Sequence, residues 1–359
     1  MSRAGDPVLV GADVLEQQVR QVLLAWGMLH GDAATAARAI TDADLAGIDS
    51  HGVSMLPTYE QLHARGELQL AALPVVLRET AVSAVLDARG GLGHPTAVRA
   101  MTLAGDKALA HGLGAVSVRG SSHFGATGYY AGLAAARGLV ALVTTTARTV
   151  SVLPTRGAEP RLSTNPLAFA APAGHHPPFL LDMSTSTTAI NKVKVRGYVD
   201  EQLPVGWVVG PDGDPVTDPH EAMTVIRTPG PGGLTPLGAT SELASHKGYG
   251  LGVMVQILSA TLSGARSGGS SDIGHFFLAL DPAAFRDDGG FEADVGELLD
   301  ELRATTPTDP DHPVLVAGDP EARSRVERAV GGIPLPGVLI TQLRALCLRA
   351  GVPFSLTPL

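Results

Sequence analysis

A change in residue pattern near Gly66 constrains the fold of this chain most strongly. Before it, apolar residues recur at the spacing of a helix, as at Leu15 and Val19. After it, short runs rich in β-branched residues alternate with turns, beginning at residues 75–77. Helical spacing returns between residues 292 and 351. Helices at both ends of the chain and strands between them predict an α+β fold.

The composition is that of a large globular protein. The 359 residues are 45% hydrophobic, which allows a sizeable core and two or three domains. The formal net charge of -9 offers no basic surface, so we expect neither nucleic acid nor a membrane as a partner. No apolar run approaches the roughly 18 residues needed to span a bilayer.

We expect the protein to be cytoplasmic. Cys347 is the only cysteine, so the chain cannot form an internal disulfide. Charged residues near the N-terminus, among them Asp6, Asp13 and Glu16, interrupt any apolar signal core.

The turn at Ser50 and His51 is the first candidate for chemistry. It follows a helix predicted over residues 32–47 with Asp32 as its N-terminal cap, and another helix is predicted over residues 56–64. A histidine beside a hydroxyl residue and a glycine, just past a helix end, is typical of a general acid with an accessible ring. A solvated or capping histidine is the alternative.

Gly91 and Gly93 lie between a predicted strand and a helix predicted over residues 97–110. They resemble the start of a dinucleotide-binding fingerprint, but Thr96 stands where a third glycine belongs. No acidic residue is found at the end of a following strand. A tight turn between strand and helix explains both glycines equally well, so we do not expect a Rossmann site here.

Two later segments carry candidate ligand-binding residues. His123 stands among small residues at the start of a helix, where accessible backbone N–H groups attract phosphate or carboxylate; a packed turn is the alternative. Arg148 is a lone cation among small hydroxyl residues after a strand over residues 139–145. It fits a carboxylate clamp, although an ordinary surface arginine is the alternative.

Several short segments, in this order along nearly the whole chain, resemble the malate/L-lactate dehydrogenase family, which is unrelated to the Rossmann lactate dehydrogenases. These segments are Ser50-His51-Gly52, Ser122-His123-Phe124-Gly125, Thr164-Asn165-Pro166, Asp182-Met183-Ser184, Val205-Gly206-Trp207, Ser245-His246-Lys247-Gly248 and Ile273-Gly274-His275-Phe276. No single match would suffice, but the ordered set is specific.

The resemblance implies an architecture of its own. Members of that family have a largely antiparallel sheet with helices, and a helical domain to which both chain ends contribute. We therefore expect a helical part over residues 1–73, a sheet-containing domain for NAD(P) and substrate over residues 74–284, and a helical part over residues 285–359 that packs with the first. The family also implies a non-Rossmann cofactor site and a homodimer.

The resemblance also assigns roles to residues. It makes His51 the proton donor to the substrate, with Ser50 as its hydrogen-bonding partner, and Thr164 a substrate contact. The implied contacts of NAD or NADP are His123, Phe124, Gly125, Ala126, Thr127, Asp182, Met183, Ser184, His246, Lys247, Gly318, Asp319 and Pro320. No metal site is expected.

One residue departs from the family pattern where the substrate binds. Met55 stands where members of the family usually have an arginine that grips the substrate carboxylate. A thioether cannot pair with a carboxylate. Arg148 is the preferred replacement cation, ahead of Lys192, Lys194 and Arg196, which share one charged stretch that is typical of a solvated surface.

The resemblance implies an NAD(P)H-dependent oxidoreductase that transfers hydride to the ketone or imine carbon of a small substrate. The first alternative is a reductase of an unusual or carboxylate-lacking intermediate, which Met55 favours. The second is a non-catalytic binding relative, against which the retained Ser50, His51 and Lys247 argue. No Gly-x-Ser-x-Gly elbow supports a serine hydrolase.

Overall fold

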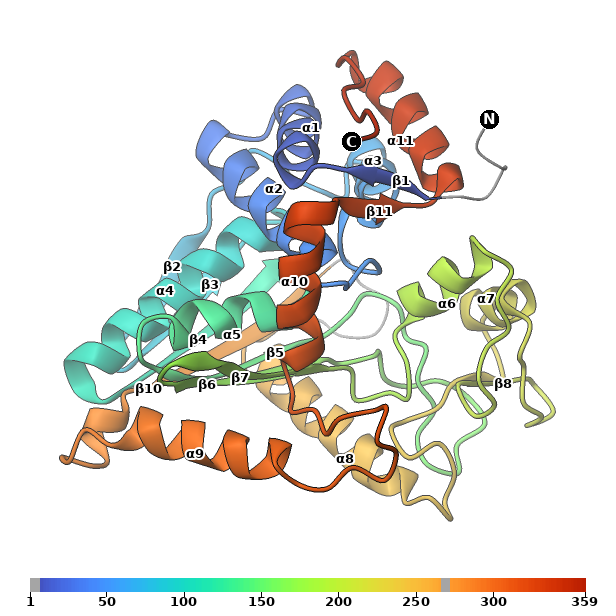
Figure 1. The fold of residues 1–359 in the computed structure, drawn as a ribbon. Coiled ribbons are helices and arrows are strands. Elements are labelled where there is room, and N and C mark those ends of the chain that lie inside the picture. The colour runs from blue at the N-terminus through green and yellow to red at the C-terminus, as the bar shows by residue number, and fades with distance from the viewer. Residues whose placement is uncertain (1–6, 266–271) are drawn as a thin grey trace.

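The structure is a computed structural model that describes residues 7–265 and 272–359. Seven strands form its main sheet in the order β2-β3-β4-β10-β5-β6-β7 (Figure 1). All neighbouring strands are antiparallel except β3 and β4, which are parallel and joined through α4. The strands are β2 Val75–Glu79, β3 Ser83–Asp87, β4 Leu113–Ser121, β5 Val140–Thr145, β6 Leu167–Ala173, β7 His176–Met183 and β10 Ile273–Leu280.

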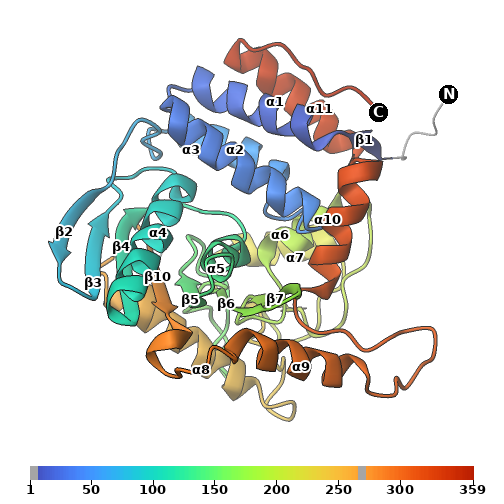
Figure 2. The same ribbon diagram turned by 60° about the vertical axis from the view of Figure 1, so that its left-hand side comes forward.

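Helices cover both faces of this sheet (Figures 1 and 2). On one face lie α4 (Gly93–His111) and α5 (Thr127–Ala135), and on the other lie α8 (Ser245–Gln256) and α9 (Phe291–Arg303). Alanines on α4 and glycines on the strands let backbones approach closely. A Cβ on Gly114, for example, would lie 2.0 Å from the Ala104 carbonyl oxygen.

A helical domain is built from both chain ends, as the resemblance implied. It comprises α1 Ala12–Ala25, α2 His30–Leu45, the 3-10 turn Val53–Met55, α3 Leu56–Ala64 and α11 Gly337–Ala350, with β1 Val8–Val10 paired to β11 Ile333–Leu335. Their apolar side chains form one continuous core that includes Leu15, Ile40, Tyr59 and Leu343. Helix α10 (Asp319–Gly331) runs from this domain down toward the sheet (Figure 1).

A smaller lobe has its own apolar cluster, which includes Val193, Val208 and Ile226. It contains α6 Ile190–Gly197, β8 Val208–Val209, α7 Pro219–Arg227 and β9 Gly233–Leu234 (Figure 1). Of the segment from residue 285 onward, α9 packs on β6, whereas α11 contacts α1 and α3.

Two predictions about individual elements need correction. Helix α2 begins at His30 rather than after Asp32, and Asp32 lies in its first turn, where it accepts a hydrogen bond of 2.5 Å from Arg99. Residues 335 and 336 are not helical, because Leu335 ends β11 and Pro336 precedes α11. Within the described residues, no helix has both the length and the apolar character needed to cross a membrane.

Candidate active site

The Ser50–His51 turn is fixed by the way α2 ends. After Leu45 the chain reverses at Gly47, which adopts a φ of 78°, and the Ile48 N–H donates to the Ala43 carbonyl at 2.8 Å. Glycine is suited to this left-handed position because it lacks a Cβ. The next turn, closed by the His51 N–H and the Ile48 carbonyl at 2.8 Å, presents the imidazole beyond the helix end.

Ser50 and His51 form the predicted pair. The Ser50 Oγ lies 2.8 Å from His51 Nδ1; Ser50 is buried and His51 is partly buried. Because the hydroxyl either donates or accepts, it holds the ring in both protonation states. With Nδ1 occupied, Nε2 is the nitrogen left to exchange a proton with a bound molecule.

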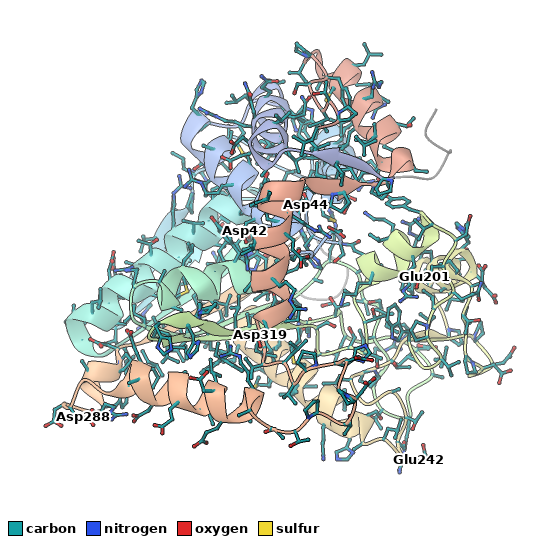
Figure 3. All side chains as sticks on the ribbon, in the orientation of Figure 1. Asp42, Asp44, Glu201, Glu242, Asp288 and Asp319 are labelled. Carbon is teal, nitrogen blue, oxygen red and sulfur yellow. The ribbon has the colours of Figure 1, made fainter. Side chains whose placement is uncertain are left out.

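Asp44 and Gly52 position the far side of the turn. The Val53 N–H donates to Asp44 Oδ2 at 2.7 Å, and burial raises the pKa of this carboxyl well above its usual value. A Cβ on residue 52 would lie 1.9 Å from Asp44 Oδ1, so only glycine fits. Figure 3 labels Asp44 and its neighbour Asp42 on α2, beside α10.

Helix α10 clamps the same turn from outside. Arg328 Nη1 donates to the Asp44 carbonyl at 2.6 Å and to Asp49 Oδ1 at 2.5 Å. One turn earlier on α10, Arg325 pairs with Asp42 at 2.9 Å. Helix α10 therefore holds the His51 turn through contacts between residues far apart in sequence, since Arg328 and Asp49 are separated by 279 positions.

A second histidine lies beside His51. The rings of His51 and His123 are stacked with centroids 5.6 Å apart, and the Tyr59 hydroxyl lies 2.7 Å from His123 Nδ1. His94 is fully buried next to them, 6.5 Å from the His123 ring, and neither of its nitrogens has a hydrogen-bond partner among the described residues. Three imidazoles and a phenol therefore meet at one place.

The site keeps these imidazoles neutral at pH 7. Burial, together with the positive charges of Lys192 and Lys194, lowers the pKa of His51 to about 4. Burial likewise lowers the pKa of His94 to about 3, and that of His123 well below its usual value. In this state His51 is a base at neutral pH.

Met55 lies on the 3-10 turn that follows His51. It is buried, and Asn191 Nδ2 approaches its sulfur to 3.1 Å. Lys194, from the same helix α6, donates to the Ser54 carbonyl at 3.1 Å. This side of the site therefore combines a thioether with an amide and an ammonium group from α6.

Arg148, the preferred replacement cation, is partly buried and ion-paired. Its guanidinium contacts Glu67, which also accepts a hydrogen bond of 2.7 Å from Arg65. Glu67 therefore neutralises Arg148 in this structure.

Three of the segments predicted to bind the cofactor come together. Asp182 Oδ2 accepts from the Gly128 N–H at 2.6 Å, which joins β7 to the His123–Thr127 loop at the start of α5. The Leu180 N–H donates to the Ala317 carbonyl at 3.1 Å, which brings the Gly318–Pro320 turn to the same strand. Ser184 and Met183 continue from Asp182, and Thr164 is buried beside Thr185.

The remaining predicted contacts are placed differently. His246 and Lys247 are exposed in the first turn of α8. The Phe124 ring is 2% exposed and stacks on His275 at 4.4 Å, so only its backbone is available to a ligand.

Asp182, one of the residues predicted to bind NAD(P), keeps acceptor capacity for a ligand. Asp182 Oδ2 accepts from the Gly128 N–H, and the Thr127 N–H also approaches this carboxyl; a carboxylate has further lone pairs with which it can accept from a ribose hydroxyl. Burial raises the pKa of this carboxyl to about 6. A space of about 10 Å³, enough for about one water molecule, lies here and is lined by Gly128, Asp182 and Arg325 among others. Gly93 borders the loop as well, since a Cβ there would lie 2.4 Å from the Ser122 carbonyl oxygen.

Sequence reasoning did not identify Tyr59, His94 or Asp44. Tyr59 is 64 positions from His123, and the buried state of Asp44 has no local signal. His94 follows the Gly91–Gly93 turn, whose glycines resemble the start of a Rossmann fingerprint. That turn packs against the His123 loop, because the Gly93 N–H donates to the His123 carbonyl at 3.1 Å.

A metal site was not expected, yet one group of side chains has suitable geometry. His175 and His176 follow the turn between β6 and β7, and Asp300 on α9 lies 3.0 Å from His176 Nε2. Their ligand atoms lie within 4.8 Å of one another. Asp300 is 124 positions from His176, so sequence spacing did not suggest the group.

Known proteins resemble this chain over almost its full length. A family model described as Malate/L-lactate dehydrogenase matches residues 10–344. The malate dehydrogenase of Pyrococcus abyssi is 34% identical over 354 residues, which covers 96% of each chain. The (2R)-3-sulfolactate dehydrogenase (NADP(+)) of Chromohalobacter salexigens is 35% identical over 277 residues, covering 74% of this chain and 78% of that protein.

A solved structure confirms the architecture. The crystal structure of malate dehydrogenase from Entamoeba histolytica superimposes with a TM-score of 0.92 at 33% identity, covering 96% of this chain and 99% of that one. The match therefore extends across the sheet, the small lobe and the helical domain. The protein belongs to the malate/L-lactate dehydrogenase family and is an oxidoreductase.

Proposed function

We propose that the protein is an NAD(P)-dependent oxidoreductase that moves a hydride between the cofactor and the carbonyl carbon of a small 2-oxo acid, with His51 as the proton donor. The observation that carries this proposal is the pair formed by Ser50 and His51, 2.8 Å apart, in a site shared with the His123 loop. That loop is where we place the nicotinamide.

His51 and the substrate oxygen exchange one proton in each turnover. A bound nicotinamide supplies or accepts the hydride. During reduction, charge builds on the carbonyl oxygen and His51 Nε2 donates a proton to it, which leaves a hydroxyl group and a neutral imidazole. During oxidation, Nε2 takes the proton from the hydroxyl group. Ser50 keeps the ring in place in both directions.

The depressed pKa of His51 has a direct consequence for direction. At neutral pH the imidazole of the free protein is ready to accept a proton, as oxidation of a 2-hydroxy acid requires. Reduction needs His51 to be protonated first. A negatively charged substrate beside Lys194 would favour that protonation, because it offsets a positive charge that lowers the pKa.

A nicotinamide cofactor is supported by the chemistry of Asp182 and its neighbours and by the name of the Chromohalobacter relative, which specifies NADP(+). Either NAD or NADP serves as the cofactor in this proposal. The protein acts as a homodimer and has neither nucleic acid nor a membrane as a partner.

A second candidate is a reductase of a substrate without a carboxylate, such as a neutral ketone or an uncharged cyclic imine. Met55 favours it, because its thioether is 5% exposed at the site and cannot pair with an anion.

Paired substrate screens separate these candidates. The purified protein is supplied with NADH or NADPH together with pyruvate, oxaloacetate, 3-sulfopyruvate, a cyclic imine carboxylate or a neutral diketone. We expect oxidation of at least one cofactor form with a 2-oxo acid as the best substrate. Turnover of the neutral diketone alone would favour the second candidate, and no turnover with any pair would contradict the proposal.

A further inference from the structure

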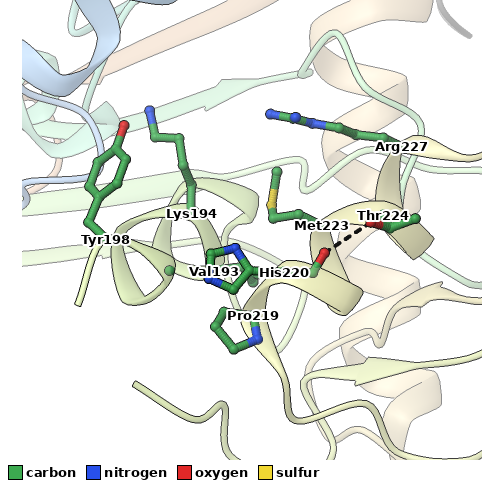
Figure 4. A pocket seen from close by; sticks show the side chains of 9 residues that line it. Val193, Lys194, Tyr198, Pro219, His220, Met223, Thr224 and Arg227 are labelled. Carbon is green, nitrogen blue, oxygen red and sulfur yellow. Dashed lines mark hydrogen bonds between the residues drawn. The ribbon is translucent and has the colours of Figure 1, made fainter. Parts of the chain in front are cut away.

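A cavity of about 310 Å³ lies between α6 and α7. Its polar lining includes Lys194, Tyr198, His220 and Arg227 (Figure 4). In Figure 4 the side chains of Lys194, Tyr198 and Arg227 rise to the same side of the two helices. A cavity of this size is suited to a small molecule, since ligand pockets begin at about 300 Å³.

Lys194 connects this cavity to the proposed proton donor. Its ammonium donates to the Ser54 carbonyl at 3.1 Å, three residues after His51. Its charge also depresses the pKa of both His51 and His123, so it acts electrostatically on both imidazoles. An anion bound to Lys194 would therefore lie beside the reacting groups.

Lys194 and Arg227 are cations that line the cavity. Among the described residues, neither Lys194 nor Arg227 forms an ion pair, although the neighbouring Arg196 pairs with Glu201 at 2.7 Å. His220 Nε2 lies 3.0 Å from Asp200 Oδ1. Burial and the charge of Arg227 lower the pKa of Lys194 to about 8. Cations that are close together and lack a carboxylate are suited to binding an anion.

We propose that Lys194, supported by Arg227, binds the carboxylate of the substrate and so selects anionic 2-oxo acids. This inference rests on the proposed function. With Lys194 as the carboxylate-binding cation, Met55 does not require a neutral substrate. Helix α6 supplies the positive charge from the other side of the Ser54–Met55 turn. The proposed role of Lys194 differs from the prediction for Arg148, whose guanidinium contacts Glu67.

The test compares a carboxylate with its uncharged ester. Wild type, Lys194→Met and Lys194→Arg are assayed with the 2-oxo acid that wild type reduces best and with the methyl ester of that acid. We expect Lys194→Met to raise the KM for the acid by about tenfold or more and to change kcat/KM for the ester by less than about threefold. Lys194→Arg restores most of the loss, and Arg227→Met has a smaller effect in the same direction.

Arg196→Gln is the matched control. It removes a cation from the same helix, but one that is occupied by Glu201 and the Gln202 carbonyl. We expect its KM for the acid to match wild type. Thermal unfolding of every variant checks that it folds.

Three outcomes overturn the inference. The first is an unchanged KM for the acid in folded Lys194→Met. The second is a rise in the KM for the cofactor instead, which would make the bound anion a cofactor phosphate. The third is a tenfold effect of Arg148→Met where Lys194→Met has none. If wild type reduces neither acid nor ester, the proposed function itself fails.

Discussion

Gly52 is the residue whose identity the geometry restricts most. We predict that Gly52→Ala destabilises the protein by about 1–3 kcal/mol and removes most activity, because the new methyl group would overlap the buried Asp44 carboxylate. The carboxylate would have to release the Val53 N–H, and the His51 turn would move. Urea unfolding and steady-state kinetics measure the two effects.

Gly31→Ala is the control for this substitution. Gly31 lies in α2, and a Cβ there meets nothing within 4 Å. Alanine has the higher helix propensity, so we expect equal or greater stability and unchanged kinetics. A Gly52→Ala protein as stable and active as Gly31→Ala would show that Asp44 does not hold the turn.

The pKa of His51 predicts how rate depends on pH. The profile of kcat/KM reports the free protein, in which the pKa of His51 is about 4. Oxidation needs neutral His51, so its kcat/KM is level between about pH 5 and 7 and falls as Lys194 loses its proton near pH 8. Reduction needs protonated His51, so its kcat/KM falls about tenfold per unit over the same range. A level profile for reduction between about pH 5 and 7 would contradict the assignment.

At the scale of elements, α10 acts as an external brace for the end of α2. We predict that Arg328→Met lowers kcat by about tenfold while the fold persists, because the Asp44 carbonyl and the Asp49 carboxylate lose their shared partner. Circular dichroism and kinetics check this.

Arg323→Met provides the comparison, since Arg323 is exposed on the same helix. We expect wild-type kcat for it. If Arg328→Met retains wild-type kcat as well, the brace is not needed for positioning.

Local patterns were sufficient for many elements and for part of the site. Residues 56–64 form α3 with the predicted bounds, and Ser50 contacts His51 as expected. These features depend on neighbours in sequence, and their capping and spacing signals are local. The fold class came from the ordered motifs, since no local pattern places β10 between β4 and β5.

The rest of the site depends on contacts that sequence does not encode locally. Lys194 donates to the Ser54 carbonyl, although the two residues are 140 positions apart in sequence. A charged stretch on a solvated surface has the same residue pattern as a charged stretch that faces a cavity, so sequence does not distinguish them. Arg148 likewise contacts Glu67, which is 81 positions away, and no local pattern around either residue predicts that contact. Burial and ion pairing, which decide whether a cation is available, are properties of the folded chain.

At the scale of the whole molecule, the buried histidines predict acid sensitivity. Burial depresses the pKa of His51, His94, His123 and His275, so below about pH 6.5 the unfolded chain takes up protons that the folded chain does not. The free energy of unfolding therefore falls as the pH drops from 6.5 toward 4.

Asp182 and Asp44 oppose this effect. Their pKa values are raised in the folded protein, so they take up protons before the unfolded chain does. With four histidines and two carboxyls, the unfolded chain binds about two more protons than the folded chain, so the free energy of unfolding changes by about 3 kcal/mol per pH unit. We predict a lower urea midpoint at about pH 5 than at pH 8. An equal or higher midpoint at the lower pH would mean that these histidines are protonated in the folded state.

The most direct test of proton exchange by His51 is the comparison of His51→Ala with wild type in two measurements on the same preparations. One is kcat with the best substrate, and the other is the cofactor Kd from calorimetry. The account predicts that kcat falls by about 10²–10⁴-fold while the Kd stays within about twofold, because His51 acts on the substrate oxygen. The exposed His111, in the last turn of α4, provides the control, since His111→Ala is expected to match wild type in both. A kcat near the wild-type value in folded His51→Ala would contradict the account.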